Sequence, residues 1–266
     1  MAILDWDDSH PIGCHPLMPS ENNLYPFTVQ WFDEIDSTNT RLLEQVRLNP
    51  ALSSGTIWAA LRQTAGRGRL ERKWVSPSCG NLLFSWYFRS SAGLSRMPSL
   101  TMAMAIAIDD MLLGFHIPSN LKWPNDVQVK GCKIAGLLAE RAGDDGVVLG
   151  VGLNVNMTAD QLAMIDQPAT SIKNETGAEW NVKDVLHILL SQHLPHWLAC
   201  WENNGFQGIS ERWIQGCGGL DAPISVRDGA RRMTGTLAGF GENGELLLCL
   251  PDGEVQTVWA GDVGAP

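Results

Sequence analysis

The segment 121–156 restricts the fold more than any other part of the sequence, because its pattern predicts three strands joined by tight turns. Residues 121–129, 132–140 and 147–156 form apolar or alternating runs. Lys130-Gly131 and the sequence Gly-Asp-Asp-Gly at 143–146 separate these runs. Connections this short join strands that run antiparallel. We therefore predict a meander of three antiparallel strands.

Further strands and helices are expected around this meander. Alternating or β-branched runs before turns predict strands, and apolar residues recurring every three or four positions predict helices. The predicted strands are 28–32, 55–61 and 81–88, and the predicted helices are 40–48, 99–115 and 182–201, the last kinked at Pro195. The expected fold class is α/β (α+β), with a mixed, largely antiparallel sheet backed by helices.

The chain changes character after residue 219. Short apolar strands, expected at 224–226, 233–240, 245–250 and 254–259, alternate with Asp-Gly, Glu-Asn-Gly and Pro-Asp-Gly turns. Several short strands with tight turns indicate a small β-barrel. The predicted organisation is an irregular N-terminal extension at 1–27, a large domain at 28–215 and a small barrel domain at 219–266.

Composition excludes several classes of protein. The formal net charge of −10 argues against sequence-independent nucleic-acid binding, because such binding relies on broad basic surfaces. The N-terminus has no basic region followed by an apolar core, so it does not resemble a secretory signal. The most apolar run, 100–115, is interrupted by Asp109 and Asp110 and is too short for a bilayer. The cysteines form no CxxC pair. We expect a cytoplasmic location, with neither a membrane nor DNA as a partner.

Positive charge is concentrated at 63–74 although the chain is acidic. Gly66 and Gly68 lie there among four cations, which are Arg67, Arg69, Arg72 and Lys73. Glycine lacks the Cβ atom that holds a backbone away from a ligand, and arginine binds phosphate or carboxylate bidentately. A solvated basic loop is the alternative. We expect the loop 65–75 to be mobile alone, because its cations repel one another, and to become ordered on an anionic ligand.

Three further polar clusters favour a binding site. Three uncharged polar residues at 37–39 stand at a predicted helix N-terminus, where a cap needs only one of them. The sequence KWPND at 122–126 offers a cation, an amide and a carboxylate, and Lys133 lies on an otherwise apolar strand, where the alternative role is a solvated edge lysine. No Ser/His/Asp order, metal-ligand spacing, P-loop or GxGxxG motif competes with these clusters. They indicate electrostatic catalysis on phosphate, in which Asp126 binds Mg²⁺ or accepts a proton.

Several motifs in register carry a resemblance to a known family. They are GRGRLERKW at 66–74, DSTN at 36–39, KWPND at 122–126, KIAGLL at 133–138, GVGLNVN at 150–156 and WAGDV at 259–263. The chain resembles a biotin protein ligase of the monofunctional type, without an N-terminal DNA-binding domain. The resemblance implies a mixed sheet followed by an SH3-like barrel. It also implies a reaction in which ATP, biotin and Mg²⁺ give biotinyl-5′-AMP, and a lysine of a biotin carboxyl carrier protein domain then takes the biotinyl group.

The resemblance also implies roles for individual residues in binding biotin. The positions that match those holding the ureido head are Ser37, Thr38, Asn39 and Gln63. That head is neutral and offers both donors and an acceptor, which suits uncharged polar side chains. The positions that match the loop over biotin and the adenylate are Arg67, Gly68 and Arg69. Lys133 matches the lysine that reaches the biotin carboxylate and the α-phosphate.

The implied nucleotide site uses neighbouring residues. The residues expected near ATP or the adenylate are Arg67, Arg69, Arg72, Trp74, Lys122 and Asn125. Asp126 is the implied metal ligand and a candidate acceptor of the proton from the carrier lysine. Trp74 either stacks on adenine or anchors the loop, and both interpretations stay open. The implied catalytic residues are Lys133, Arg69 and Asp126.

The sequence departs from the family pattern in two places, and two rival functions remain. Leu70-Glu71 replaces a basic residue and a glycine that many relatives have, and Ala169-Thr-Ser-Ile172 stands where some relatives place an aromatic residue against adenine. A lipoate or octanoate protein ligase is one rival, although its substrates have no ureido head for the polar residues at 37–39. A non-catalytic biotin-binding module is the other, although it would not need the lysine and the arginine loop.

Overall fold

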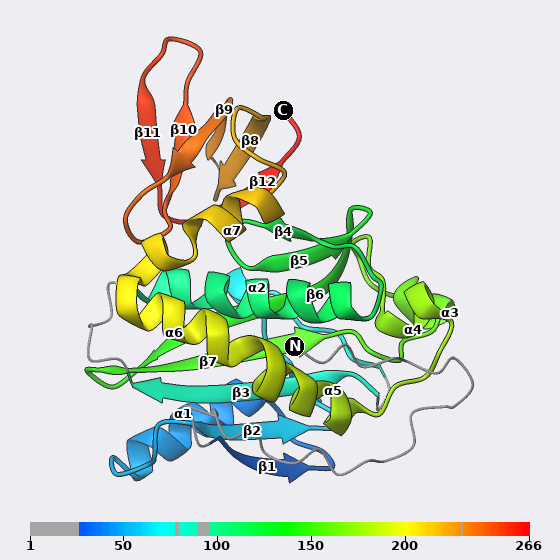
Figure 1. Ribbon diagram of the computed structural model, residues 1–266. Coiled ribbons are helices and arrows are strands. Elements are labelled where there is room, and N and C mark those ends of the chain that lie inside the picture. Colours follow the sequence, from blue (N-terminus) through cyan, green and yellow to red (C-terminus); the bar gives the residue numbers. More distant parts are fainter. Residues whose placement is uncertain (1–26, 78–79, 90–95, 230) are drawn as a thin grey trace, which may run out of the picture.

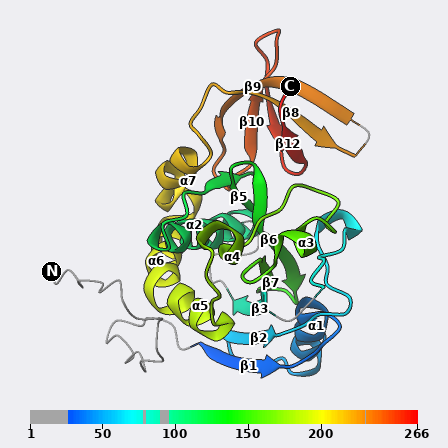
Figure 2. The ribbon, with the colours of Figure 1, turned by 90° about the vertical axis from the view of Figure 1, so that its right-hand side faces the viewer.

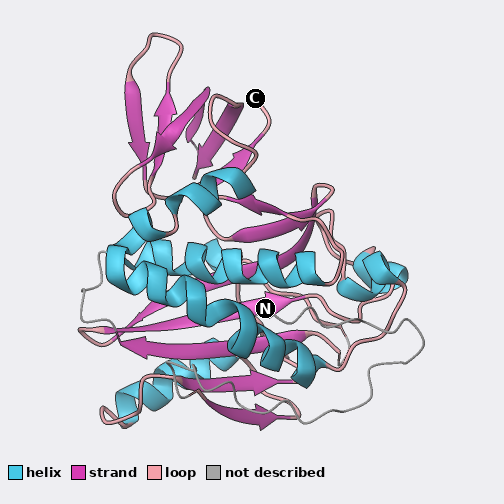
Figure 3. Ribbon diagram, in the orientation of Figure 1, coloured by secondary structure: helices cyan, strands magenta, loops and turns pink. Residues whose placement is uncertain are grey.

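The computed structural model describes residues 27–77, 80–89, 96–229 and 231–266 of the 266-residue chain. The N-terminal extension expected at 1–27 lies outside the described residues, apart from its last residue. Figure 3 shows that the larger part of the molecule contains both helices and strands, whereas the C-terminal part is built from strands.

A seven-stranded sheet forms the centre of the molecule (Figure 1). Its strands, in spatial order, are β1 (Thr28–Phe32), β2 (Thr56–Ala60), β3 (Leu82–Arg89), β7 (Gly146–Leu153), β6 (Cys132–Ala142), β5 (Asp126–Val129) and β4 (Asn120–Lys122). The pair β1–β2 is parallel and the other pairs are antiparallel. The predicted meander is confirmed as β5–β6–β7, and the mixed, largely antiparallel sheet is confirmed with it.

The two faces of the sheet carry different partners. Alternate residues of β3, such as Phe84 and Trp86, pack into the main hydrophobic core with helices α2 (Met97–Gly114), α5 (Val182–Ile188) and α6 (Leu194–Asn204). Tyr87 on the opposite face packs with α1 (Thr38–Leu48) in a separate small cluster. Figure 2 shows the sheet between these two layers, with α1 on the side away from α2, α5 and α6. The face that carries α1 also carries the candidate site.

The helices largely follow the sequence pattern. Helix α2 matches the expected helix at 99–115, and the helix expected at 182–201 is broken near Pro195, where the π-helical segment η3 (Leu189–His193) separates α5 from α6. The remaining short helices were not predicted, and they are η1 (Arg69–Glu71), α3 (Ala159–Leu162), α4 (Ile172–Thr176), η4 (Gly205–Gly208) and α7 (Ser210–Gly216). Among the described residues, α2 has the length and composition of a membrane span, contrary to the expectation that this run is too short. Because 72% of α2 is buried inside the protein, it is a core helix.

The C-terminal strands form a second, five-stranded antiparallel sheet, which we call the C-terminal sheet. Its strands are β8 (Pro223–Asp228), β9 (Arg231–Phe240), β10 (Leu246–Cys249), β11 (Val255–Val258) and β12 (Asp262–Gly264), in the order β11-β10-β9-β8-β12. Its buried residues continue the main hydrophobic core, and the Trp123 indole N–H donates to the Gly244 carbonyl at 3.0 Å. The expected C-terminal β structure is confirmed, and β12 is a strand that the pattern missed.

Candidate active site

A cavity of about 80 Å³ lies where α1, the basic loop, β5–β7 and the C-terminal sheet meet. The sequence-predicted residues that line it are Ser37, Thr38, Asn39, Gln63, Arg67, Gly68, Arg69, Arg72, Trp74, Asn125, Asp126 and Lys133. Lys122 is the exception: it lies on β4 opposite Asp126 and does not line this cavity. Segments separated by up to about two hundred positions therefore meet at one cavity. The alternative of a solvated basic loop does not explain this grouping.

The N-terminus of α1 forms the uncharged end of the cavity. Ser37 is the N-cap, and its hydroxyl accepts from the Thr40 N–H at 3.4 Å. The cap therefore uses one of the three polar residues, as expected. Thr38 turns inward, where its backbone N–H donates to Gln63 Oε1 at 2.7 Å and its hydroxyl lies 3.0 Å from the same oxygen. Thr38 and Asn39 are almost fully buried.

Asn39 joins this end of the cavity to residues that the sequence did not identify. Its amide donates to Glu140 Oε2 at 2.9 Å and to the Leu138 carbonyl at 3.3 Å. Its carbonyl oxygen accepts from the buried Ser85 hydroxyl. A Cβ atom at Gly150 would lie 2.2 Å from this same oxygen, so the side chain fits only because position 150 is a glycine. Asn39 is thus held in a single orientation.

The basic loop folds back on itself as a narrow hairpin. The Trp74 N–H donates to the Gly66 carbonyl at 3.0 Å, and the Gly68 N–H donates to the Arg72 carbonyl at 2.7 Å. A Cβ atom at Gly66 would lie 2.7 Å from the Trp74 carbonyl oxygen, which explains why this position needs glycine. Leu70 at the tip has a φ of 52° and a side chain that is 66% exposed.

Three of the four loop cations have partners elsewhere in the chain. Arg67 forms an ion pair with Glu140 at 2.9 Å, and Arg72 forms one with Asp262 of β12. Arg69 donates to Asn125 Oδ1 at 3.2 Å and to the Gly261 carbonyl at 3.4 Å. These contacts give the loop a defined structure, because they offset the repulsion between its cations, such as that between Arg69 and Arg72. Whether ligand binding changes the order of the loop stays a prediction.

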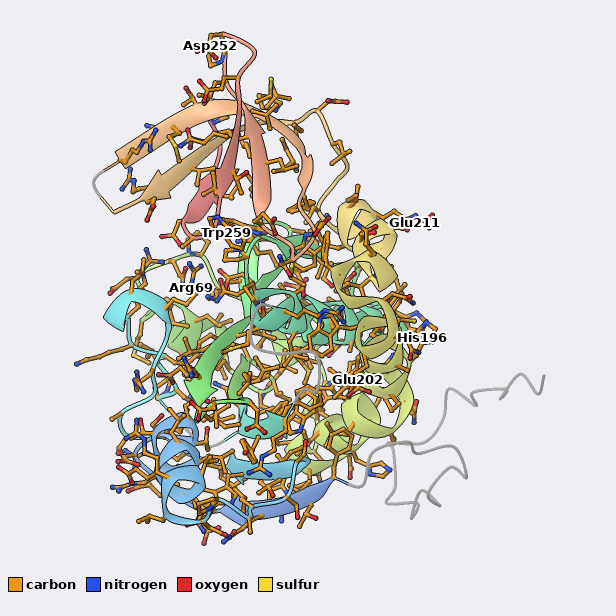
Figure 4. The ribbon with its side chains drawn as sticks, turned by 90° about the vertical axis from the view of Figure 1, so that its left-hand side faces the viewer. Arg69, His196, Glu202, Glu211, Asp252 and Trp259 are labelled. Carbon is orange, nitrogen blue, oxygen red and sulfur yellow. The ribbon has the colours of Figure 1, made fainter. Side chains whose placement is uncertain are left out.

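Arg69 is the most enclosed of these cations. Figure 4 shows it at the junction between the main body and the C-terminal sheet, near Trp259. Burial lowers the pKa of the Arg69 guanidinium from its ordinary value, and the nearby Asp262 and Asp126 oppose that shift. An arginine remains cationic under these conditions, because its ordinary pKa lies so far above neutral. A desolvated cation binds an incoming anion more strongly than a solvated one does.

Lys133 forms an ion pair with Asp126, with 2.6 Å between Nζ and Oδ1. Their side chains are 17% and 19% exposed, and β6 is an interior strand of the sheet. The alternative of a solvated lysine on an edge strand is therefore wrong. Asp126 Oδ1 is buried, and among the described residues the ion pair with Lys133 is the contact that offsets the cost of burying this oxygen. This pair forms the charged end of the cavity.

Trp74 occupies much of the space between the two ends. Cβ atoms at Gly152 and Gly136 would lie 2.4 Å and 2.9 Å from its ring, so the indole rests directly on the sheet backbone. Lys133 Nζ lies 5.7 Å from the ring centroid, and the indole N–H is buried without a hydrogen-bond partner among the described residues. The cavity is smaller than the roughly 300 Å³ of a typical ligand site. A groove of about 1040 Å³ lies along the loop, and Trp74 lines both this groove and the cavity.

The donor set also bears on the magnesium ion that the resemblance implies. The described residues contain no group of three or more His, Cys, Asp and Glu side chains that could hold a metal ion. Asp126 supplies one carboxylate, whose Oδ1 is paired with Lys133, and Asn125 supplies an amide oxygen, which accepts from Arg69. Mg²⁺ is commonly held by one or two carboxylates together with substrate phosphates. The residues present therefore fit an ion that arrives with a nucleotide.

Comparisons with known proteins identify the family of the chain. The model of the biotin/lipoate A/B protein ligase family matches residues 31–156. The biotin–[acetyl-CoA-carboxylase] ligase of Paracoccus denitrificans is 34% identical over 238 residues, covering 86% of this chain and 96% of the relative. The bifunctional ligase/repressor BirA of Escherichia coli is 30% identical, over 86% of this chain and 71% of BirA.

A solved structure shows the same fold. The biotin protein ligase of Aquifex aeolicus, in complex with biotin and ATP, superposes with a TM-score of 0.75 and 30% identity. The match covers 89% of this chain and 97% of that protein. One assignment follows from the fold, from the sequence similarity over most of the chain and from the grouping of the motif residues around one cavity. The chain belongs to the biotin protein ligase family.

Proposed function

We propose that this chain is an ATP-dependent ligase that activates biotin as biotinyl-5′-AMP and transfers it to a lysine of a biotin carboxyl carrier protein. The relative from Paracoccus denitrificans is named for ligating biotin to acetyl-CoA carboxylase, and the Aquifex aeolicus structure holds biotin and ATP. The observation that carries the proposal is the cavity itself. It joins an uncharged hydrogen-bonding end to a cationic end, as a ligand with a ureido head and an acyl phosphate requires.

The uncharged end binds the ureido head of biotin. Thr38 and Gln63 offer a hydroxyl group and a carbonyl oxygen at the cavity wall, and the Ser37 hydroxyl lies beside them. Asn39 is engaged with Leu138, Glu140 and Ser85 and thereby holds this wall in place. A neutral head group with two N–H donors and one carbonyl acceptor matches such a wall without burying an unpaired charge.

The cationic end lowers the barrier of the first step. In that step a carboxylate oxygen of biotin bonds to the α-phosphorus of ATP, the bond to the β-phosphate oxygen breaks, and pyrophosphate leaves. Two anions must approach one another, so cations preorganised beside them favour both the encounter and the transition state. We assign Lys133 to the carboxylate and the α-phosphate, and Arg69 and Arg72 to the phosphate oxygens. Arg67 and Gly68 close the loop over the adenylate.

The second step needs a proton acceptor. The ε-amine of the carrier lysine bonds to the acyl carbon, the bond to the AMP oxygen breaks, and the amine loses a proton. Asp126 is the carboxylate nearest the charged end and accepts that proton once Lys133 has turned to the phosphate. A bound Mg²⁺, held by Asp126 and Asn125 with the phosphates, would offset phosphate charge. Trp74 leaves the sheet when the adenylate forms, and adenine stacking is then available to it.

The same proposal covers the organisation and surroundings of the chain. The proposed catalytic domain is 28–215 and the proposed small β domain is 219–266, and Asp262 of β12 forms an ion pair with Arg72 of the loop. We infer a cytoplasmic location, in keeping with a reaction that consumes ATP. The proposed partners are biotin, ATP and the carrier domain, and neither DNA nor a membrane is part of the reaction.

One experiment tests the function. Purified protein, ATP, Mg²⁺, biotin and a biotin-carrier domain are incubated, and the mass of the carrier is measured. The expected result is the mass of one biotinyl group added to the carrier lysine. Biotin binding without ATP-dependent transfer would instead support a binding module. Pyrophosphate exchange that responds to lipoate or octanoate in place of biotin would support the rival ligase.

A further inference from the structure

A serine beneath the uncharged end of the cavity has no role in the mechanism so far. Ser85 lies in the middle of β3, is fully buried, and pairs in register with Gly150 of β7. Its hydroxyl oxygen lies 2.7 Å from Thr38 Oγ1 and also contacts Asn39 Oδ1. It thus connects two side chains of α1 that face the cavity, although its neighbours on β3 are apolar.

The available hydrogens determine which group donates and which accepts in each contact of this cluster. The Asn39 amide nitrogen donates to Glu140 and to the Leu138 carbonyl, so the amide oxygen Oδ1 is the atom that faces Ser85, and an amide oxygen can only accept. The contact between Ser85 and Asn39 therefore uses the one hydrogen of the Ser85 hydroxyl. Ser85 Oγ is then left as an acceptor toward Thr38.

The Thr38 hydroxyl must choose between two acceptors. It lies 2.7 Å from Ser85 Oγ and 3.0 Å from Gln63 Oε1, and it has one hydrogen for both. Two oxygens without a hydrogen between them repel more strongly at the shorter distance. The hydrogen therefore belongs to the contact with Ser85. Gln63 Oε1 keeps the Thr38 backbone N–H as a donor and retains an open acceptor position at the cavity wall.

We propose that Ser85 is a positioning residue, which directs the Thr38 hydroxyl away from Gln63 so that Gln63 Oε1 accepts an N–H of the biotin ureido group. The inference rests on the proposed function and adds a determinant of substrate specificity to it. In a Ser85→Ala variant the Thr38 hydroxyl turns to Gln63 and occupies the acceptor position. Asn39 Oδ1 loses its donor at the same time. Both changes act on biotin and leave the phosphate end untouched.

The test compares two buried serines. Ser85→Ala should raise the KM for biotin by about tenfold or more, because a buried polar partner is lost, while kcat and the KM for ATP change less than about twofold. Ser99 is the matched control: it is also fully buried, but lies on α2 and accepts from the Trp201 indole at 2.9 Å. Ser99→Ala should lower the thermal midpoint and leave both KM values unchanged.

A second variant keeps the proposal testable if Ser85→Ala does not fold. Ser85→Cys keeps the shape and a weaker donor, so it should give a KM for biotin between those of the wild type and the alanine variant. An unchanged KM for biotin in a folded Ser85 variant would overturn the proposal, as would equal changes in both KM values. If the wild-type protein forms no biotinyl adenylate, the proposed function fails instead, so the two failures are distinguishable.

Discussion

Replacing Lys133 by alanine tests the catalytic role of the cationic end of the site separately from its effect on the stability of the fold. Its ammonium lies 2.6 Å from Asp126, and both side chains are about one-fifth exposed. The substitution removes the cation that would stand between the biotin carboxylate and the α-phosphate. It also leaves the Asp126 carboxylate without its ion-pair partner. We therefore expect a loss of activity and a smaller loss of stability.

The magnitudes follow from distance and exposure. Two unit charges 4 Å apart interact by about 4 kcal/mol at an effective dielectric constant of 20. Removing one preorganised group from a charged transition state typically costs about 3–4 kcal/mol, or about 100- to 1,000-fold in rate. Breaking a fully buried ion pair costs about 3–5 kcal/mol of stability. Because water reaches both Lys133 and Asp126, we expect a stability loss of about 1–2 kcal/mol.

Two measurements separate these effects. Pyrophosphate release reports adenylation, and carrier labelling from added biotinyl-5′-AMP reports transfer alone; Lys133→Ala should impair the first far more than the second. Lys173→Ala is the control, since Lys173 also pairs with a carboxylate and is 29% exposed, but lies on α4. Adding Asp126→Asn to Lys133→Ala should recover stability without recovering adenylation. Near-normal pyrophosphate release by folded Lys133→Ala would show that the ion pair is only structural.

Three further predictions concern other parts of the molecule. Gly150→Ala places a Cβ atom 2.2 Å from Asn39 Oδ1 and should abolish biotin binding. Gly114→Ala is the control, because a Cβ atom there meets nothing within 4 Å, and it should leave biotin binding intact. Equal biotin binding by both variants would contradict the packing argument. Asp262→Ala removes the ion-pair partner of Arg72 and should speed protease cleavage of loop 65–75 in ligand-free protein. Cleavage should slow again when biotin and ATP are added. Cleavage rates that respond neither to the substitution nor to the ligands would refute the prediction that this loop becomes ordered on binding. Burial lowers the pKa of His193, so its contribution to stability is present above the unfolded pKa of about 6.5 and is lost as pH falls below that value. His193→Gln should therefore reduce the fall in thermal midpoint between about pH 7.5 and pH 5.5. A parallel fall in the wild type and the variant would exclude the effect.

Much of the fold follows from local pattern. The meander β5–β6–β7 was predictable because strand alternation and turn residues are both local signals. The parallel pairing of β1 with β2 was not, since it joins segments separated by α1 and depends on which edge of the sheet remains open. The short helix α7 follows two glycines that predict only the end of a preceding helix. Its buried residues make it part of the core all the same, which no local period reveals.

The candidate site divides in the same way. Residue type and motif identified the side chains that face the cavity, because a phosphate or a ureido group demands particular chemistry. They assigned no role to Glu140, Asp262 or Ser85, which contact residues of the first set and look ordinary in their own strands. Glu140 lies 73 positions from its partner Arg67, and Asp262 lies 190 positions from Arg72. Only tertiary structure brings such pairs together.

These partners change how substrate binding must be understood. Glu140 holds Arg67, Asp262 holds Arg72, and Trp74 covers the sheet where a ligand would lie. Under the proposed function, binding the adenylate exchanges protein carboxylates for phosphate, and the net gain is the difference between two sets of ion pairs. That difference is smaller than the full attraction of free cations for phosphate. We expect pyrophosphate and AMP to leave when the carboxylates pair with the arginines again, whereas a loop of unpartnered cations would retain both products more strongly.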